Sequence, residues 1–73
     1  MFGYVKKEKL LDEIRAEIQL CVNMIEKYDA LIKSLCHGGA DSITINSHLD
    51  VLHEWEARRS QSVRIFNMVE QTT

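Results

Sequence analysis

Eight side chains in the first half of the chain, all apolar or aromatic, follow one another at alternating spacings of three and four residues. Such a heptad row places every member on one face of an α-helix. This row is termed the seam. The opposite face is polar or alanine except at Leu20, so the pattern predicts an amphipathic helix over residues 5–36. The seam residues are Leu11, Ile14, Ile18, Cys21, Ile25, Tyr28, Ile32 and Leu35.

A second helix is predicted over residues 47–70, after a connector that covers residues 37–46. Gly38 and Gly39 provide a stop for the first helix, and Ser47 is a suitable N-cap residue for the second. The alternating stretch SITI, residues 42–45, indicates a short extended segment within the connector. In the second helix the spacing of three and four continues through Leu52, Trp55, Arg59, Ser62, Phe66 and Val69.

Two helices joined in this way predict an all-α fold, an antiparallel two-helix hairpin in a single domain of 73 residues. A turn around residues 41 and 42 would place Trp55 opposite Tyr28. One hairpin leaves part of the apolar stripe uncovered, and exposed stripes of that length are normally covered by another chain. We therefore expect a homo-oligomeric helical bundle, most simply four helices from two hairpins, with higher assemblies also open. The predicted interface residues are Leu11, Ile14, Ile18, Ile25, Tyr28, Ile32 and Phe66.

Composition narrows the class of partner. The net charge is −2, which does not favour binding to nucleic acid. No apolar run approaches the roughly 20 residues that a membrane-spanning helix needs, and the start MFGYVKKEK reverses the order of a signal peptide. We expect a cytoplasmic protein with reduced cysteines, no membrane partner and no nucleic-acid partner.

Residues 36–53 contain one cysteine and all three histidines of the chain, which raises the question of a metal site. His48 and His53 are five residues apart and would point about 140° apart on a helix, whereas helical ligand pairs use spacings of three or four. Cys36 and His37 are adjacent and diverge. The pattern is more typical of a helix–loop–helix junction. No nucleophile, base and orienting group are brought together either, so we expect no metal, no cofactor and no enzymatic activity.

Six of the nine basic residues fall into two groups, Lys6, Lys7 and Lys9, and Arg58, Arg59 and Arg64. Arg59 occupies a seam-like position, where a permanent charge is costly unless it is paired. Two interpretations stay open: an ion pair with an acidic neighbour such as Glu26, or a phosphate ligand held by arginines beside a stacking aromatic ring. The candidate ligand or partner residues are Tyr4, Lys6, Lys7, Lys9, His53, Trp55, Arg58, Arg59 and Arg64.

The opening MFGYVKKEKLLDEI resembles the short accessory proteins of phages and mobile elements, in which a few residues precede a basic start to a long amphipathic helix. The resemblance implies a small non-enzymatic binding protein that inhibits a host defence protein in the host cytoplasm. It also implies an alternative, a homo-oligomeric sponge that sequesters a small anionic nucleotide messenger in a basic pocket between subunits. In that alternative the arginines of one subunit and the lysines of another contact the phosphates.

Overall fold

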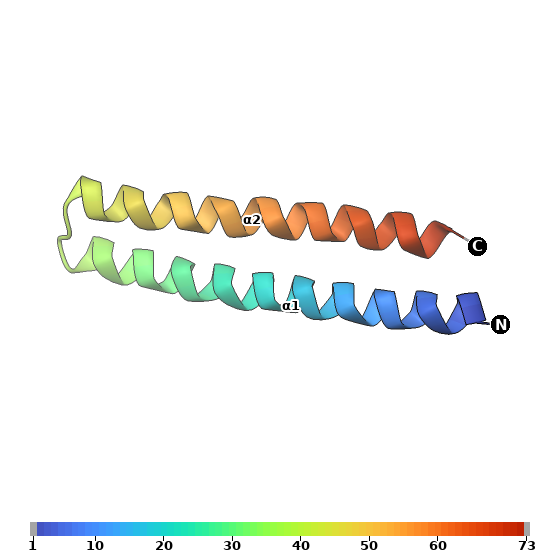
Figure 1. Cartoon of the computed structure of the whole chain (residues 1–73). Coiled ribbons are helices and arrows are strands. Elements are labelled where there is room, and N and C mark those ends of the chain that lie inside the picture. Colours follow the sequence, from blue (N-terminus) through green and yellow to red (C-terminus); the bar gives the residue numbers. More distant parts are fainter. Residues whose placement is uncertain (1, 73) are drawn as a thin grey trace.

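The computed structural model describes the backbone of residues 2–72 and the side chains of residues 6–72. Two helices, α1 (Phe2–His37) and α2 (Ser42–Gln71), account for 93% of this part of the chain, which contains no strand. They run antiparallel along their whole length, so both termini lie at the same end (Figure 1). The predicted all-α hairpin is therefore confirmed.

Local chemistry ends α1 where the two glycines were predicted to stop it. Gly39 has a positive φ of 78°, the left-handed conformation that glycine adopts at little cost. The amide of Gly39 donates to the carbonyl of Cys36 (3.4 Å), and the amide of Ala40 donates to the carbonyl of Leu35 (3.0 Å). This pair of bonds is a Schellman motif, which satisfies carbonyls that the end of the helix leaves without partners.

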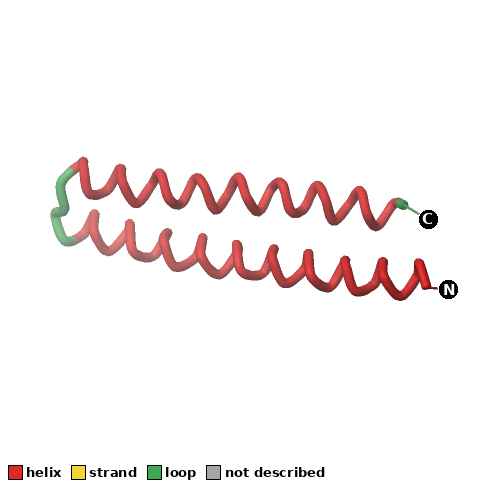
Figure 2. The backbone as a smooth tube through the Cα atoms, in the orientation of Figure 1, coloured by secondary structure: helices red, strands yellow, loops and turns green. Residues whose placement is uncertain are grey.

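The connector is shorter than predicted and covers residues 38–41 (Figure 2). Residues 42–45 are the first turn of α2, so the predicted extended segment and the predicted start at residue 47 are wrong. Asp41 is the N-cap, and its Oδ1 accepts from the amide of Thr44 at 2.8 Å. Ser47 lies inside the helix, where its hydroxyl donates to the carbonyl of Ile43 at 3.0 Å. Asp41 takes the capping role because aspartate at this position can bind an amide that has no partner within the helix.

The Asp41 cap makes the hairpin sensitive to acid. Hydrogen bonds from the Thr44 side chain and amide lower the pKa of the Asp41 carboxyl. Because the folded pKa lies below the unfolded value of about 3.9, the stabilisation is fully present above that value and is lost as pH falls through the folded pKa. We expect Asp41→Ala to lower the melting temperature at pH 7 by about 4 to 8 °C, and the difference from wild type to shrink as the pH falls below the unfolded value and through the folded pKa.

Asp41→Asn is the matched control, because asparagine caps a helix about as well and does not titrate. Thermal melts followed by circular dichroism between pH 2.5 and pH 7 measure both variants. Equal melting temperatures for the alanine variant and the wild type at pH 7 would contradict the assigned cap.

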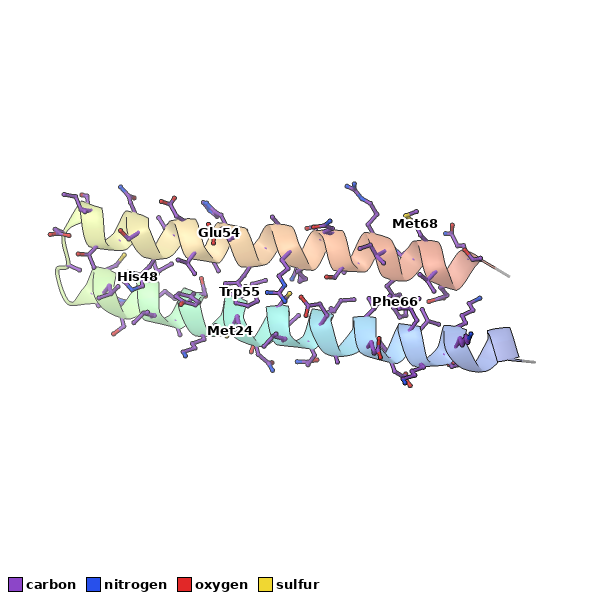
Figure 3. All side chains as sticks on the ribbon, in the orientation of Figure 1. Met24, His48, Glu54, Trp55, Phe66 and Met68 are labelled. Atoms are coloured by element: carbon purple, nitrogen blue, oxygen red, sulfur yellow. The ribbon has the colours of Figure 1, made fainter. Side chains whose placement is uncertain are left out.

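The seam of α1 faces α2, as predicted. All eight seam residues are buried or half-buried, whereas the residues on the opposite face of α1 are exposed. Leu11 and Cys21 are buried from α1, and Leu52 and Ser62 from α2. In Figure 3, Trp55 and Phe66 point from α2 toward α1, and Met68 points away. The hairpin is held by a single row of contacts between two helices.

The helices are paired in a different register from the predicted one. His48, and not Trp55, lies beside Tyr28, with ring centroids 6.4 Å apart. The shift follows from the early start of α2, because a turn centred nearer the glycines moves every opposing pair. Ile45 and His48 therefore extend the row of three and four spacings of α2 toward its first turn, and both are half-buried.

Candidate functional site

The hairpin is a rod that exposes much more surface than its mass requires. Its principal extents are 58 × 14 × 12 Å, and it exposes 5636 Å². A globular monomer of 8.5 kDa exposes about 4,650 Å², so the excess is about 1,000 Å². Leu11, Cys21 and Leu52 are the only apolar side chains that are buried among residues 6–72. A large part of the apolar stripe therefore lies open to solvent.

The exposed apolar side chains are concentrated on one side of the rod. On α1, the exposed Leu10 and Leu31 and the half-buried Met24 belong to one row at seven-residue intervals. The row is completed by Glu17, and Leu20 lies next to it because it is three residues from Glu17 and four from Met24. On α2 the corresponding side carries Ile65 and Met68. This surface is termed the apolar flank, and its members are Leu10, Leu20, Met24, Leu31, Ile65 and Met68.

An ion pair shows that these rows of α1 and α2 lie on the same side. The guanidinium of Arg58, which is seven residues before Ile65, bonds to the carboxylate of Glu17. The hydrogen bond with Glu17 raises the pKa of the Arg58 guanidinium. The same guanidinium lies over the Trp55 ring, 4.9 Å from its centroid. The middle of the apolar flank thus carries a paired charge and a half-buried indole.

The other side of the hairpin has a mixed character. Arg15 donates to Asp12 at 2.9 Å, and its guanidinium lies 5.2 Å from the centroid of the Phe66 ring. A shallow, open groove is lined by Arg15, Ile18, Gln19 and Phe66. Val63, with 39% of its surface exposed, is the one large apolar residue on this side that is exposed among the described side chains. This surface is termed the mixed flank, and its exposed members include Glu8, Arg15, Asp29, Glu56, Val63 and Glu70.

The predicted basic and aromatic residues are only partly brought together. Arg58 and Trp55 are in contact, but Arg59, Arg64 and His53 are exposed. Arg59 forms no ion pair with Glu26 within residues 6–72, so the first of the two interpretations left open for this residue is not observed with that partner. Arg58 forms the pair between helices instead, because its position beside the seam lets its long side chain reach across to Glu17.

The lysines lie about 20 Å along the rod from Arg58, by the helical rise. Lys7 is half-buried, and its Nζ donates to the carbonyls of Glu70, at 3.1 Å, and of Thr72. A cation is favoured at the C-terminus of a helix, where carbonyls lack partners. Lys7 is thus occupied within the hairpin, whereas Lys6 and Lys9 are exposed. The predicted side-chain contact of Tyr4 lies outside the described side chains.

Two of the three histidines, His37 and His48, have roles in the helical structure. The ring of His48 bonds through Nδ1 to the carbonyl of Thr44 at 2.8 Å, while His37 ends α1. Cys36 is exposed and Cys21 is buried. Within residues 6–72, no three histidine, cysteine or acidic side chains are grouped so that they could hold a metal ion.

Glu17 was not among the residues predicted from the sequence. A signal for it exists, because it is the one charged residue in a heptad row that is otherwise Leu10, Met24 and Leu31. A cation from the neighbouring helix stabilises a half-buried acid at such a position, and Arg58 supplies it.

No protein-family model matches this chain, and no curated protein or solved structure matches it either. Among the described residues, neither helix contains a stretch that is long and apolar enough to cross a membrane. The interpretation of the site therefore depends on its own geometry and chemistry.

Proposed function

We propose that this protein is a non-enzymatic helical binding protein whose apolar flank is covered by another protein surface. The observation that carries the proposal is the position of the exposed apolar residues. Among residues 6–72, five of the seven large apolar side chains that are exposed lie on this flank: Leu10, Leu20, Leu31, Ile65 and Met68. Large apolar side chains that gather on one side of a protein in this way are typical of a protein interface.

The composition of the flank also favours a protein partner. Its centre holds Trp55 and Arg58, and tryptophan and arginine are among the residue types that contribute most to binding energy in protein interfaces. Arg58 is already paired with Glu17, which lowers the cost of removing the guanidinium from water when the flank is covered. Leucine, isoleucine and methionine around this pair supply the apolar area.

We further propose that the protein that covers the apolar flank is a host defence protein or a second copy of the chain, and that this chain inhibits a host defence protein. This part of the proposal depends on the resemblance of the N-terminal stretch to phage accessory proteins. The nucleotide-sequestering alternative has weaker support, because Arg58 is occupied by Glu17 and Trp55, and Lys7 by main-chain carbonyls.

Capture with matched variants tests the proposal. Ile65 and Val63 lie two residues apart on α2 with 43% and 39% of their surface exposed, and they belong to opposite flanks. A tagged wild-type chain and a tagged Val63→Glu chain are expected to retain the same protein, either a second copy or a different chain. Ile65→Glu is expected to lose it. Equal capture by all three chains, or retention of a small molecule with no protein, would contradict the proposal.

A further inference from the structure

We propose that a second copy of this chain covers the apolar flank, with the two hairpins antiparallel, so that α1 of one copy packs against α1 of the other about Leu20. The inference depends on the proposed function and names the protein that occupies the flank. The two-fold axis would pass near the middle of the rod and relate identical surfaces, the commonest arrangement of soluble homodimers.

The surface area fits a dimer of this kind. The hairpin exposes about 1,000 Å² more than a globular chain of its mass. Each partner in a stable protein complex of standard size buries about 800 Å². Covering one flank of the rod with a second rod therefore removes about the amount of surface that is in excess.

The residues of the flank are complementary to themselves when the hairpins are antiparallel. Glu13, Leu20 and Lys27 form one row of α1 at seven-residue intervals, and both charged side chains are exposed. Antiparallel packing about Leu20 places Glu13 of each copy opposite Lys27 of the other. The same symmetry places Leu10 opposite Leu31. In this arrangement each of these charged side chains thus lies opposite a side chain of opposite charge, and each of these leucines lies opposite another leucine.

The distribution of charge along the rod favours the same orientation. The half that holds the chain ends, residues 1–20 and 57–73, has seven basic and five acidic side chains, a net charge of +2. The half next to the turn, residues 21–56, has two basic and six acidic side chains, a net charge of −4. Antiparallel packing brings unlike halves together, whereas parallel packing brings like halves together. Electrostatic complementarity of this kind fixes orientation in protein complexes.

Exchange of the two charges tests the arrangement. Glu13→Lys and Lys27→Glu are each expected to weaken dimerisation about tenfold at low salt, because each turns two attractive pairs into two repulsive ones. The double variant is expected to recover most of the wild-type affinity. Within one chain these residues are 14 positions apart, about 21 Å along the helix, so only contact between copies can produce the recovery.

Glu26→Lys is the matched control, because it makes the same change of charge at an exposed position of α1 away from the flank. Sedimentation velocity over a dilution series measures all four variants and the wild type. A control that dissociates as strongly as Glu13→Lys, a double variant as weak as the single ones, or a monomeric wild type would overturn the inference. If the capture experiment then shows that the wild type retains a protein other than a second copy, and that Ile65→Glu loses it, the proposed function still holds.

A distance measurement tests the orientation without altering the flank. Cys36 is exposed and Cys21 is 0% exposed, so a spin label reacts at Cys36. Cys36 lies 16 residues from Leu20, so antiparallel packing separates the two labels by about 50 Å, by the helical rise. Parallel packing would bring them to within about 30 Å, and that result in pulsed electron resonance would overturn the antiparallel arrangement.

Discussion

Replacing Ile25 with aspartate is expected to destabilise the hairpin by about 3 kcal/mol and to abolish its assembly. Ile25 belongs to the seam and is half-buried between α1 and α2. The change removes an apolar side chain from the row of contacts and introduces a carboxylate that has no cation to pair with. Among residues 6–72, the cation that reaches across to α1 near the middle of the rod is Arg58, and Glu17 already occupies it.

Ala30→Asp is the control for this experiment, because it adds the same charge to α1 at an exposed position opposite the seam. Urea unfolding followed by circular dichroism measures both variants at several protein concentrations. We expect the control to unfold close to the wild type, since surface substitutions usually change stability by less than about 0.5 kcal/mol. A stable and fully helical Ile25→Asp variant would show that the seam does not hold the two helices together.

The second large effect is expected at Leu52, which is 7% exposed and is one of three buried apolar side chains among residues 6–72. Leu52→Ala removes apolar contacts and leaves a cavity, which costs about 2 to 4 kcal/mol in protein cores. So small a core has few other contacts to compensate. Ile43→Ala on the same helix is the control, because Ile43 is 78% exposed and its loss is expected to change little.

Thermal melts of the two alanine variants, at equal protein concentration, compare them directly. If Ile43→Ala lowers the melting temperature as much as Leu52→Ala, the side chains that support the hairpin are not those that the structure buries. Ile43 would then lie in a contact with another copy, which the proposed arrangement does not include.

The heptad pattern was sufficient to predict the fold of α1 and the face it buries. The seam has no irregular step, and each of its members lies against α2 or close to it. The glycine stop was also predictable, because Gly39 adopts a conformation that other residues seldom take. These features depend on local chemistry and on spacing, which a sequence records directly.

The start of α2 was not predicted correctly, because two signals competed there. The alternation in residues 42–45 is typical of an extended segment, and Ser47 is as good a cap residue as Asp41. The helix is favoured because it continues the row of three and four spacings of α2 through Ile45 and His48, and both of these side chains are half-buried. The earlier start changes the register, so that His48 lies beside Tyr28.

The sequence pointed to the types of residue in the candidate site, arginine and tryptophan, but not to the residues that they contact. Trp55 and Arg58 were both among the predicted site residues, and they are in contact. Arg59 was singled out because it occupies a seam-like position, but it is the side chain of the neighbouring Arg58 that extends across to α1. Glu17 completes the site from the other helix, and pairing across helices depends on register. Register in turn depends on the turn, which the sequence left open between residues 37 and 46.

We propose that the apolar flank is covered by a protein, and that this protein is a second copy of the chain. Sedimentation equilibrium of the purified protein tests it most directly. One chain has a mass of 8.5 kDa, so we expect a particle of about 17 kDa, twice that mass, that dissociates on dilution and more readily in Ile65→Glu than in Val63→Glu. A folded particle of 8.5 kDa at every concentration, with the same helical content in all three chains, would contradict it.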